Sequence, residues 1–198
     1  MKQILFFSIL FLLFAFNCSA KAEYAVGYFV TKNNDTVLCK ILIPKSFGQF
    51  DDLALFSQVT ILDSVGHKTK YTPDEINGYV FVYNQKRYTY ISKPVDDNGE
   101  QKFMWLVNFG KKVNEYCYYR SSSDNLDKGG MAAVEVIYVL ENALTGETAA
   151  ITRGGSVLNS YKAQLRRFFE NDNRLMSLIT VDVKDYSDIS RFVEDANN

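Results

Sequence analysis

The sequence contains few of the residue types on which most catalytic and metal sites depend. Its single histidine, His67, lies between Gly66 and Lys68 with no cysteine nearby in the 198-residue chain. A zinc site or a histidine-based triad would need partners from distant segments, so His67 is expected to be an exposed turn residue. The motifs G-x-S-x-G and H-E-x-x-H are both absent. The residue patterns predict no catalytic motif, no metal site and no cofactor.

An excess of charge of either sign is also lacking. The 22 Lys and Arg residues against 23 Asp and Glu residues give a net charge of −1, which excludes a strongly basic nucleic-acid-binding protein. Residues 96–100 resemble a calcium loop, but the sixth position is Gln101, where that loop needs glycine. Residues 154–156, Gly-Gly-Ser, lack the spacing and the lysine of a phosphate loop. A turn that precedes a helix explains them.

Only one long hydrophobic run occurs, at residues 4–16, and it is interrupted only by Ser8. Together with Lys2 before it and small residues after it, this run predicts a signal peptide at residues 1–20, cleaved after Ala20 or Ala22. Residues 21–198 would form a single exported domain. A membrane span needs about 20 apolar residues, so no transmembrane span is expected in the mature chain. An alternative is a lipoprotein anchored at Cys18, although Asn17 is not the small residue that usually precedes such a cysteine.

Two cysteines, Cys39 and Cys117, remain after the predicted leader. In an oxidising compartment they could form a disulfide. They could equally be two small apolar residues in strands, which is a common role of free cysteine. The sequence does not give the distance between them, so both interpretations stay open.

The rest of the chain favours β structure. Apolar residues make up 47% and aromatic residues 15%, with 13 Tyr and 15 Phe, which favour half-buried strands. Short alternating segments predict an antiparallel hairpin at residues 24–31 and 36–43, and a strand at residues 59–62. Further strands are expected at residues 68–71, 79–83, 87–91, 102–109, 113–120, 131–140 and 148–153. Residues 45–52 and 92–101 are expected to be loops, and residues 121–130 are the stretch most prone to disorder.

Residues 71–83 hold the clearest local signals. Thr72 and Glu75 have the spacing of a capping box around one helical turn, with Pro73 at its first position. Asn77 and Gly78 are expected to end that turn with a left-handed residue. The strand that follows is apolar on both faces, which is typical of a strand in the middle of a core.

After residue 156 the hydrophobic period changes from two to that of a helix. One helix is indicated by Leu158, Tyr161, Leu165, Phe168 and Phe169, and a second by Leu175, Met176, Leu178 and Ile179. A third, capped by Ser187 or Asp185, has the apolar face Ile189, Phe192, Val193 and Ala196. Strands followed by helices predict an α+β fold. It is expected to be a mainly antiparallel meander sheet, sandwich or open barrel, with the helices of about residues 156–198 packed on it.

Two acidic residues lie within strands that are otherwise apolar or aromatic, Glu115 and Glu135. Such carboxyls could act as the acids of a hydrolase, or they could point to solvent from the polar face of a sheet. Nearby aromatic residues could form a stacking platform for sugars or peptides, although most are expected in the core. These are Phe103, Trp105, Tyr116, Tyr118 and Tyr119.

Three stretches resemble a group of uncharacterised secreted proteins of Bacteroidetes bacteria. They are G-Y-F-V-T-K-N-N-D-T-V at residues 27–37, K-Y-T-P-D-E-I-N-G-Y at 70–79 and L-R-R-F-F-E-N-D-N-R-L at 165–175. The resemblance carries no known catalytic residue, and it implies a Gram-negative envelope or exported location. It also implies that Thr36 and Ser64, each within an Asp-Ser/Thr-aliphatic tripeptide, are candidate O-glycosylation sites.

These features favour an exported envelope protein with a binding or scaffolding role. Its location would be periplasmic, associated with the outer membrane, or secreted. Its partner would be an envelope protein or a glycan. The alternatives are a hydrolase acting on glycans or peptides through scattered carboxylates, and a surface lipoprotein anchored at Cys18.

Overall fold

The computed structural model describes residues 22–95, 99–122, 133–153 and 160–198. The N-terminal part contains β1 (Tyr24–Thr31), β2 (Thr36–Leu42), the short strands β3 (Lys45–Ser46) and β4 (Gln49–Phe50), the 3-10 helix η1 (Leu53–Phe56), β5 (Val59–Leu62) and β6 (Lys68–Tyr71). Six more strands follow: β7 (Ile76–Tyr83), β8 (Lys86–Pro94), β9 (Gln101–Asn108), β10 (Val113–Ser122), β11 (Ala133–Asn142) and β12 (Thr148–Ile151). The chain ends in α2 (Tyr161–Phe168), α3 (Asn173–Val181), the 3-10 turn η4 (Tyr186–Asp188) and α4 (Ile189–Asn197).

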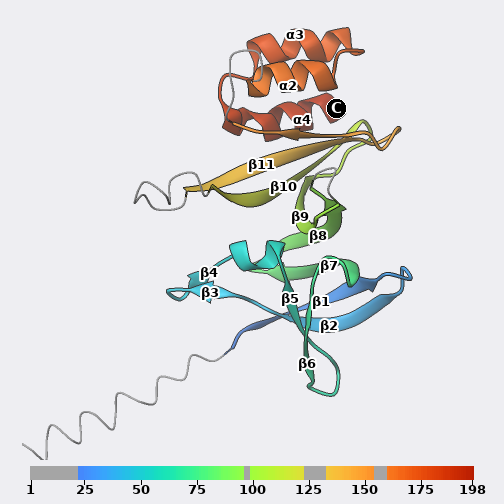
Figure 1. The fold of residues 1–198 in the computed structure, drawn as a ribbon, viewed down its shortest axis with the longest axis vertical. Helices are drawn as coiled ribbons and strands as arrows, with labels where there is room; N and C mark the ends of the chain where they lie inside the picture. The colour runs from blue at the N-terminus through green and yellow to red at the C-terminus, as the bar shows by residue number, and fades with distance from the viewer. Residues whose placement is uncertain (1–21, 96–98, 123–132, 154–159) are drawn as a thin grey trace, which may run out of the picture.

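Ten of the strands form one antiparallel sheet, which confirms the predicted α+β class. The order across the sheet is β12-β11-β10-β9-β8-β7-β1-β2-β5-β6. Figure 1 shows the N-terminal strands at one end of the molecule and the helices at the other, with β8–β11 between them. The order departs from a simple meander at one point, because β7 pairs with β1 and not with β6, the strand before it. The sheet is open, with β6 and β12 at its two edges.

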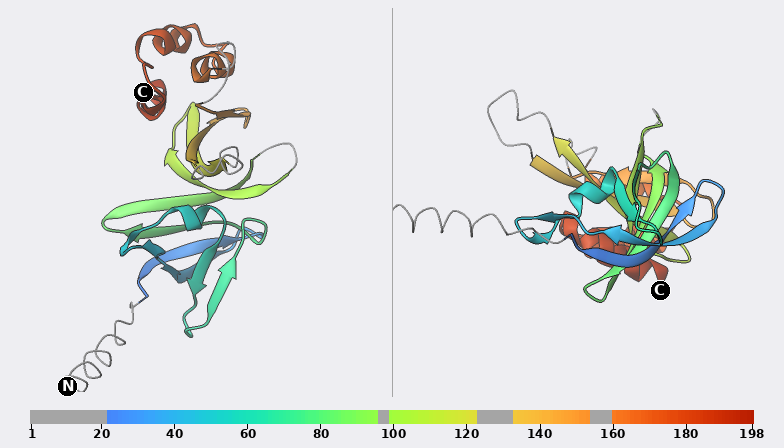
Figure 2. Two further views of the ribbon diagram at one scale, coloured as in Figure 1. Left: turned by 60° about the vertical axis from the view of Figure 1, so that its left-hand side comes forward. Right: turned by 90° about the horizontal axis from the view of Figure 1, so that it is seen from below.

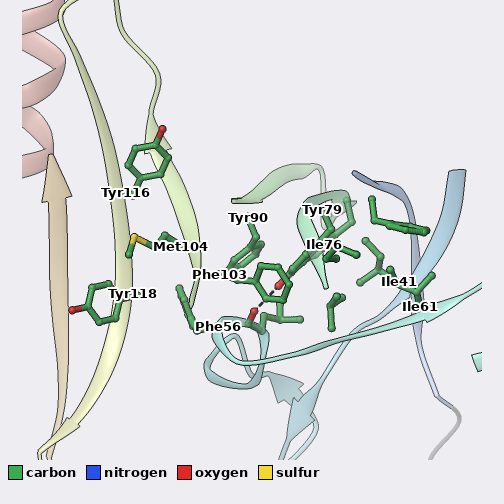
Figure 3. Close-up of a cluster of buried hydrophobic side chains, with 14 of the residues drawn as sticks. Ile41, Phe56, Ile61, Ile76, Tyr79, Tyr90, Phe103, Met104, Tyr116 and Tyr118 are labelled. Carbon is green, nitrogen blue, oxygen red and sulfur yellow. Dashed lines mark hydrogen bonds between the residues drawn. The ribbon is translucent and has the colours of Figure 1, made fainter. Parts of the chain in front are cut away.

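Much of the main core lies on one side of the sheet, which we call the inner face, defined by Ile41, Ile61, Tyr79, Phe81, Tyr90 and Phe103. All six side chains are at most 3% exposed. Their rings form a ladder across neighbouring strands, and Tyr79 stacks on Tyr90 with ring centroids 4.9 Å apart. Helix η1 covers this ladder through Phe56, and its Leu55 carbonyl accepts a 2.6 Å hydrogen bond from the Tyr79 hydroxyl (Figure 3). The same core also includes buried residues on the opposite side of β9–β11, namely Met104, Tyr116, Tyr118, Ile137 and Val139.

The sheet coils strongly around this core. Tyr71 of the edge strand β6 stacks on Phe29 of β1 at 5.2 Å, although β2 and β5 lie between their strands. Rings separated by two strands of a flat sheet could not touch, because each strand spacing adds about 4.8 Å. The coil also explains how the short link at residues 72–75 can lead from the sheet edge back to the middle.

Figure 2 shows the helices at the end of the molecule away from the N-terminal strands. There they cover the inner face of β10–β12. Val113, Leu140 and Ile151 of the sheet form a second core with the helices. The predicted apolar face of the last helix is confirmed, since Ile189, Phe192, Val193 and Ala196 are all buried. The Asp172 carboxylate caps α3 by accepting the Leu175 amide, and Asp185 forms a capping box with Asp188 at η4.

Three local predictions were wrong. Asn77 and Gly78 do not end a helical turn, because β7 already begins at Ile76 and neither residue has a positive φ. Gly78 is needed for another reason: a Cβ atom there would lie 2.4 Å from the Tyr90 carbonyl oxygen. The expected loop at residues 92–101 begins later, since β8 continues to Pro94, and residues 45–52 contain the β3–β4 hairpin.

Candidate binding surface

Glu115, one of the two predicted acidic residues, is not exposed to solvent. It lies in β10 on the inner face, opposite Leu140, and is 0% exposed. Its carboxylate accepts hydrogen bonds of 2.5 Å from the Asn108 amide of β9 and from the Ser190 hydroxyl of α4. Burial raises the pKa of Glu115, and the two hydrogen bonds oppose that rise. Glu115 therefore connects the last helix to the sheet.

Glu135 does not share a site with Glu115. It lies five residues before Leu140 on β11, and an odd spacing places its side chain on the opposite face of the sheet. Its carboxylate accepts a 2.9 Å hydrogen bond from Arg120 and one of 3.3 Å from the Arg153 amide. The structure therefore does not bring this pair of carboxylates together, as two-carboxylate hydrolysis would require.

A second polar cluster, which the sequence did not indicate, lies on the other face. The Lys93 ammonium of β8 donates a 2.5 Å hydrogen bond to Glu141 of β11 and lies 4.6 Å from the centre of the Tyr116 ring. Asn114 and Tyr116 also donate to Glu141, at 3.0 and 2.8 Å. Burial acts to raise the pKa of Glu141, but these hydrogen bonds outweigh it and leave the pKa lowered. Each of the three donors bonds to Glu141, as expected of a structural network.

The predicted aromatic platform is mostly core. Phe103, Tyr116 and Tyr118 are at most 4% exposed, which fits the expected structural role. Trp105 and Tyr119 are partly buried. The Lys86 ammonium lies 4.2 Å from the centre of the Trp105 ring, and Phe56 packs edge-on against Tyr119. The rings therefore do not form a continuous exposed platform.

Other candidate residues are also accounted for. Cys39 and Cys117 are free thiols and do not form the disulfide that the sequence left open. Their strands, β2 and β10, are separated by four others in the sheet. His67 is exposed and lies 3.4 Å from Asp63 in its turn. Thr36 and Ser64 are exposed, at the start of β2 and in a turn. Residues 96–98 and 154–159, and with them the calcium-like and Gly-Gly-Ser segments, lie outside the described residues.

Two surface grooves lie near the helical end of the described structure. One, of about 700 Å³, is lined by Phe109, Gly110, Lys111, Asn114, Ala143, Asn197 and Asn198. The other, of about 480 Å³, includes Glu147 and Asp172, but the Asp172 carboxylate already caps α3. Neither groove contains Glu115 or Glu135.

The surface that differs most from an ordinary sheet face is the side of β1, β2, β6, β7 and β8 opposite the inner face, which we call the open face. Val26, Leu38 and Val82 on this side are 72%, 79% and 56% exposed. The strand registers place their side chains together with Tyr24, Tyr28, Lys40, Lys68, Lys70 and Arg87. Exposed apolar groups gathered on one face are typical of binding sites.

The open face is also basic. None of the strands β1–β9 contains an aspartate or glutamate, and their basic residues are Lys40, Lys45, Lys68, Lys70, Lys86, Arg87, Lys93 and Lys102. Lys68 lies 5.8 Å from the centre of the Tyr24 ring, and Arg87 donates a 3.1 Å hydrogen bond to the Tyr28 hydroxyl. Within the described part of the chain, Lys40, Lys68, Lys70 and Arg87 form no ion pair. Their positive charge is therefore uncompensated by direct partners.

Comparisons with protein families, with curated proteins and with solved structures find no match. No group of three or more His, Cys, Asp or Glu side chains that could hold a metal ion occurs among the described residues. Among these residues, too, no helix has the length and hydropathy needed to cross a lipid bilayer.

The sequence held one signal for the open face that whole-chain composition conceals. The net charge of −1 is a sum over the whole chain. It combines strands β1–β9, which contain no acidic residue, with the acidic residues of the turns, β10, β11 and the helices. Charge counted strand by strand would have shown the separation.

Proposed function

We propose that this protein is an exported, non-enzymatic binding module of the bacterial envelope, and that the open face holds its partner. The observation that carries the proposal is the exposure of Val26, Leu38 and Val82 beside four unpaired basic groups. Burial of these aliphatic side chains by a partner would contribute about 25 cal/mol for each Å² removed from water. The positive charges select a partner that is anionic.

The buried Glu115 and the partly buried Glu141 support a binding role over a hydrolytic one. Glu115 is enclosed between the sheet and α4 with two hydrogen-bond donors, and Glu141 is held by three. Each carboxylate thus has a structural task in the fold. The leader predicted at residues 1–20 and the resemblance to secreted Bacteroidetes proteins support the envelope location.

A photo-crosslinking residue introduced in place of Leu38 tests the open face in living cells. The matched control replaces Leu144, which is 87% exposed in the turn between β11 and β12 and far from the open face in sequence and sheet order. We expect irradiation to attach an envelope component, protein, glycan or lipid, at position 38 and not at 144. Equal labelling at both positions, or none at either, would refute the proposed role of the open face.

N-terminal analysis and intact-mass measurement of the protein from its native host test the export proposal. A start at Lys21 or Glu23 is expected for a cleaved signal peptide. A lipid-modified start at Cys18 would instead establish the lipoprotein alternative. The same mass measurement reports on the exposed Thr36 and Ser64, because an unmodified mass would remove both as glycosylation sites.

A further inference from the structure

We propose that the partner of the open face is an anionic lipid bilayer, whose phosphate headgroups lie against Lys40, Lys68, Lys70 and Arg87. This inference rests on the proposed function and narrows it to one ligand class. Binding to an anionic bilayer requires three properties of the surface: uncompensated positive charge, exposed aliphatic groups, and side chains suited to the boundary between headgroups and acyl chains.

The positive charge is spread over three strands, β2, β6 and β8. Lys40 of β2 lies in register with Leu62 of β5 and, through it, with Lys68 of β6, while Lys70 lies one step further along the same side of β6. Asp63, in the turn between β5 and β6, is five residues from Lys68, and its carboxylate accepts the backbone amides of Val65 and His67. In the described structure Asp74, four residues after Lys70, forms no ion pair with it. Each lysine near an anionic membrane strengthens binding by about fivefold.

The aliphatic groups lie among the charges. Val26 is the register partner of Lys40, and Val82 is the partner of Arg87. A soluble polyanion would contact the charges but gain little from Val26, Leu38 and Val82. A bilayer offers both phosphates and acyl chains, since lysine and arginine can extend to the headgroups while aliphatic side chains lie deeper.

Tyr28 of β1 fits the same boundary. Tyr24 and Tyr28 are partly buried on the open face, each beside a basic group of β6 or β8, but the hydroxyl of Tyr24 is itself covered. Tyrosine is enriched where membranes meet water, because its ring is apolar and its hydroxyl polar. The surface therefore combines the residue types of an interfacial membrane contact, and it has no acidic side chain in its strands to repel phosphate.

Vesicle co-sedimentation tests this inference with the purified mature protein. One set of vesicles is phosphatidylcholine alone, and the other contains phosphatidylglycerol at 30% as the anionic lipid. We expect binding only to the anionic vesicles, weakened by added salt because exposed charges are screened. The triple variant Lys40→Glu, Lys68→Glu, Lys70→Glu is expected to bind at least about 100-fold more weakly, from about fivefold for each lysine.

The matched control is Lys111→Glu, Arg174→Glu, Lys184→Glu, which makes the same charge change on exposed residues elsewhere. This control variant is expected to bind the anionic vesicles within threefold of the wild type, whether the mature N-terminus is unmodified or carries a lipid. The double variant Leu38→Ser, Val26→Ser keeps every charge and is expected to bind severalfold more weakly, because acyl contacts are lost.

Three outcomes would overturn the inference. The first is equal binding to both kinds of vesicle, and the second is an equal loss in the control variant. The third is binding to soluble dextran sulfate, with the same dependence on the lysines, without binding to vesicles. That third result would leave the proposed binding role of the open face intact, whereas failure of crosslinking at position 38 would remove the role itself.

Discussion

Replacement of Glu115 by glutamine is expected to make the protein more stable at neutral pH and to leave its stability nearly unchanged in acid. Glu115 is completely buried and accepts hydrogen bonds only from the neutral groups of Asn108 and Ser190. A glutamine can accept from the Asn108 amide through its oxygen and donate to the Ser190 hydroxyl through its nitrogen. The substitution therefore removes the buried charge and keeps the connection between α4 and the sheet.

The size of the effect follows from the raised pKa. Because the folded pKa of Glu115 lies above the ordinary value of 4.5, the folded protein binds more protons than the unfolded chain between the two values. The free energy of unfolding of the wild type must then fall as the pH rises through this range. The loss is about 1.4 kcal/mol for each unit by which burial raises the pKa. The glutamine variant has no such loss.

Urea unfolding at a series of pH values from 4 to 8 measures this difference directly. The advantage of the Glu115→Gln variant is expected to appear above pH 4.5 and to level off above the folded pKa. At pH 4, where Glu115 is protonated, the two proteins are expected to agree within about 1 kcal/mol, the range of a single neutral hydrogen bond. A difference that is constant across the series, or that grows toward acid, would refute the argument that burial governs Glu115.

Three further predictions concern the core and its polar network. Glu141→Gln is expected to show the opposite pH dependence. Because the pKa of Glu141 is lowered, the wild type is the more stable protein above pH 4.5 and loses this advantage as the pH falls through the folded pKa, which a urea series extended below pH 4 measures. Gly78→Ala is expected to destabilise the fold by more than about 2 kcal/mol in urea, because the new Cβ meets the Tyr90 carbonyl oxygen at 2.4 Å and no flexible side chain can move aside. Phe192→Ala is expected to cost about 3–5 kcal/mol and to increase proteolysis of the C-terminal helices, because the ring is 2% exposed between α4 and its neighbours.

Local patterns predicted the elements well wherever neighbours in sequence are neighbours in space. The first hairpin and the apolar face of α4 follow from spacing alone. The pairing of β1 with β7 could not be predicted, because it joins residues about 50 apart and depends on the coil of the whole sheet. The burial of Glu115 was missed for a related reason: residues 113–118 are all buried, so alternation along β10 does not separate an inner side from an outer one.

The open face was hidden for a different reason, which lies in β1. Tyr24, Val26, Tyr28 and Val30 share one side of this strand and carry its larger side chains, whereas the inner side has Ala25, Gly27 and Phe29. Size and hydropathy would favour the first set as the core. The neighbouring strand β7 lies too close to Gly27 for a side chain there, because a Cβ atom at Gly27 would lie 2.1 Å from the Val80 carbonyl oxygen. The side of β1 with the smaller residues is therefore the one that faces the core.

The covering segments explain why this surface remains free. Helix η1 covers the inner face near β7–β9, and the C-terminal helices cover the inner face of β10–β12, so both covers lie on one side of the sheet. The described chain provides no such cover for Val26, Leu38 and Val82. Threonine would satisfy the strand preference at these positions equally well. A Leu38→Thr change is therefore expected to leave unfolding within about 0.5 kcal/mol of wild type. If it instead destabilises the protein as a core substitution does, Leu38 serves the fold and the argument for a partner loses its basis.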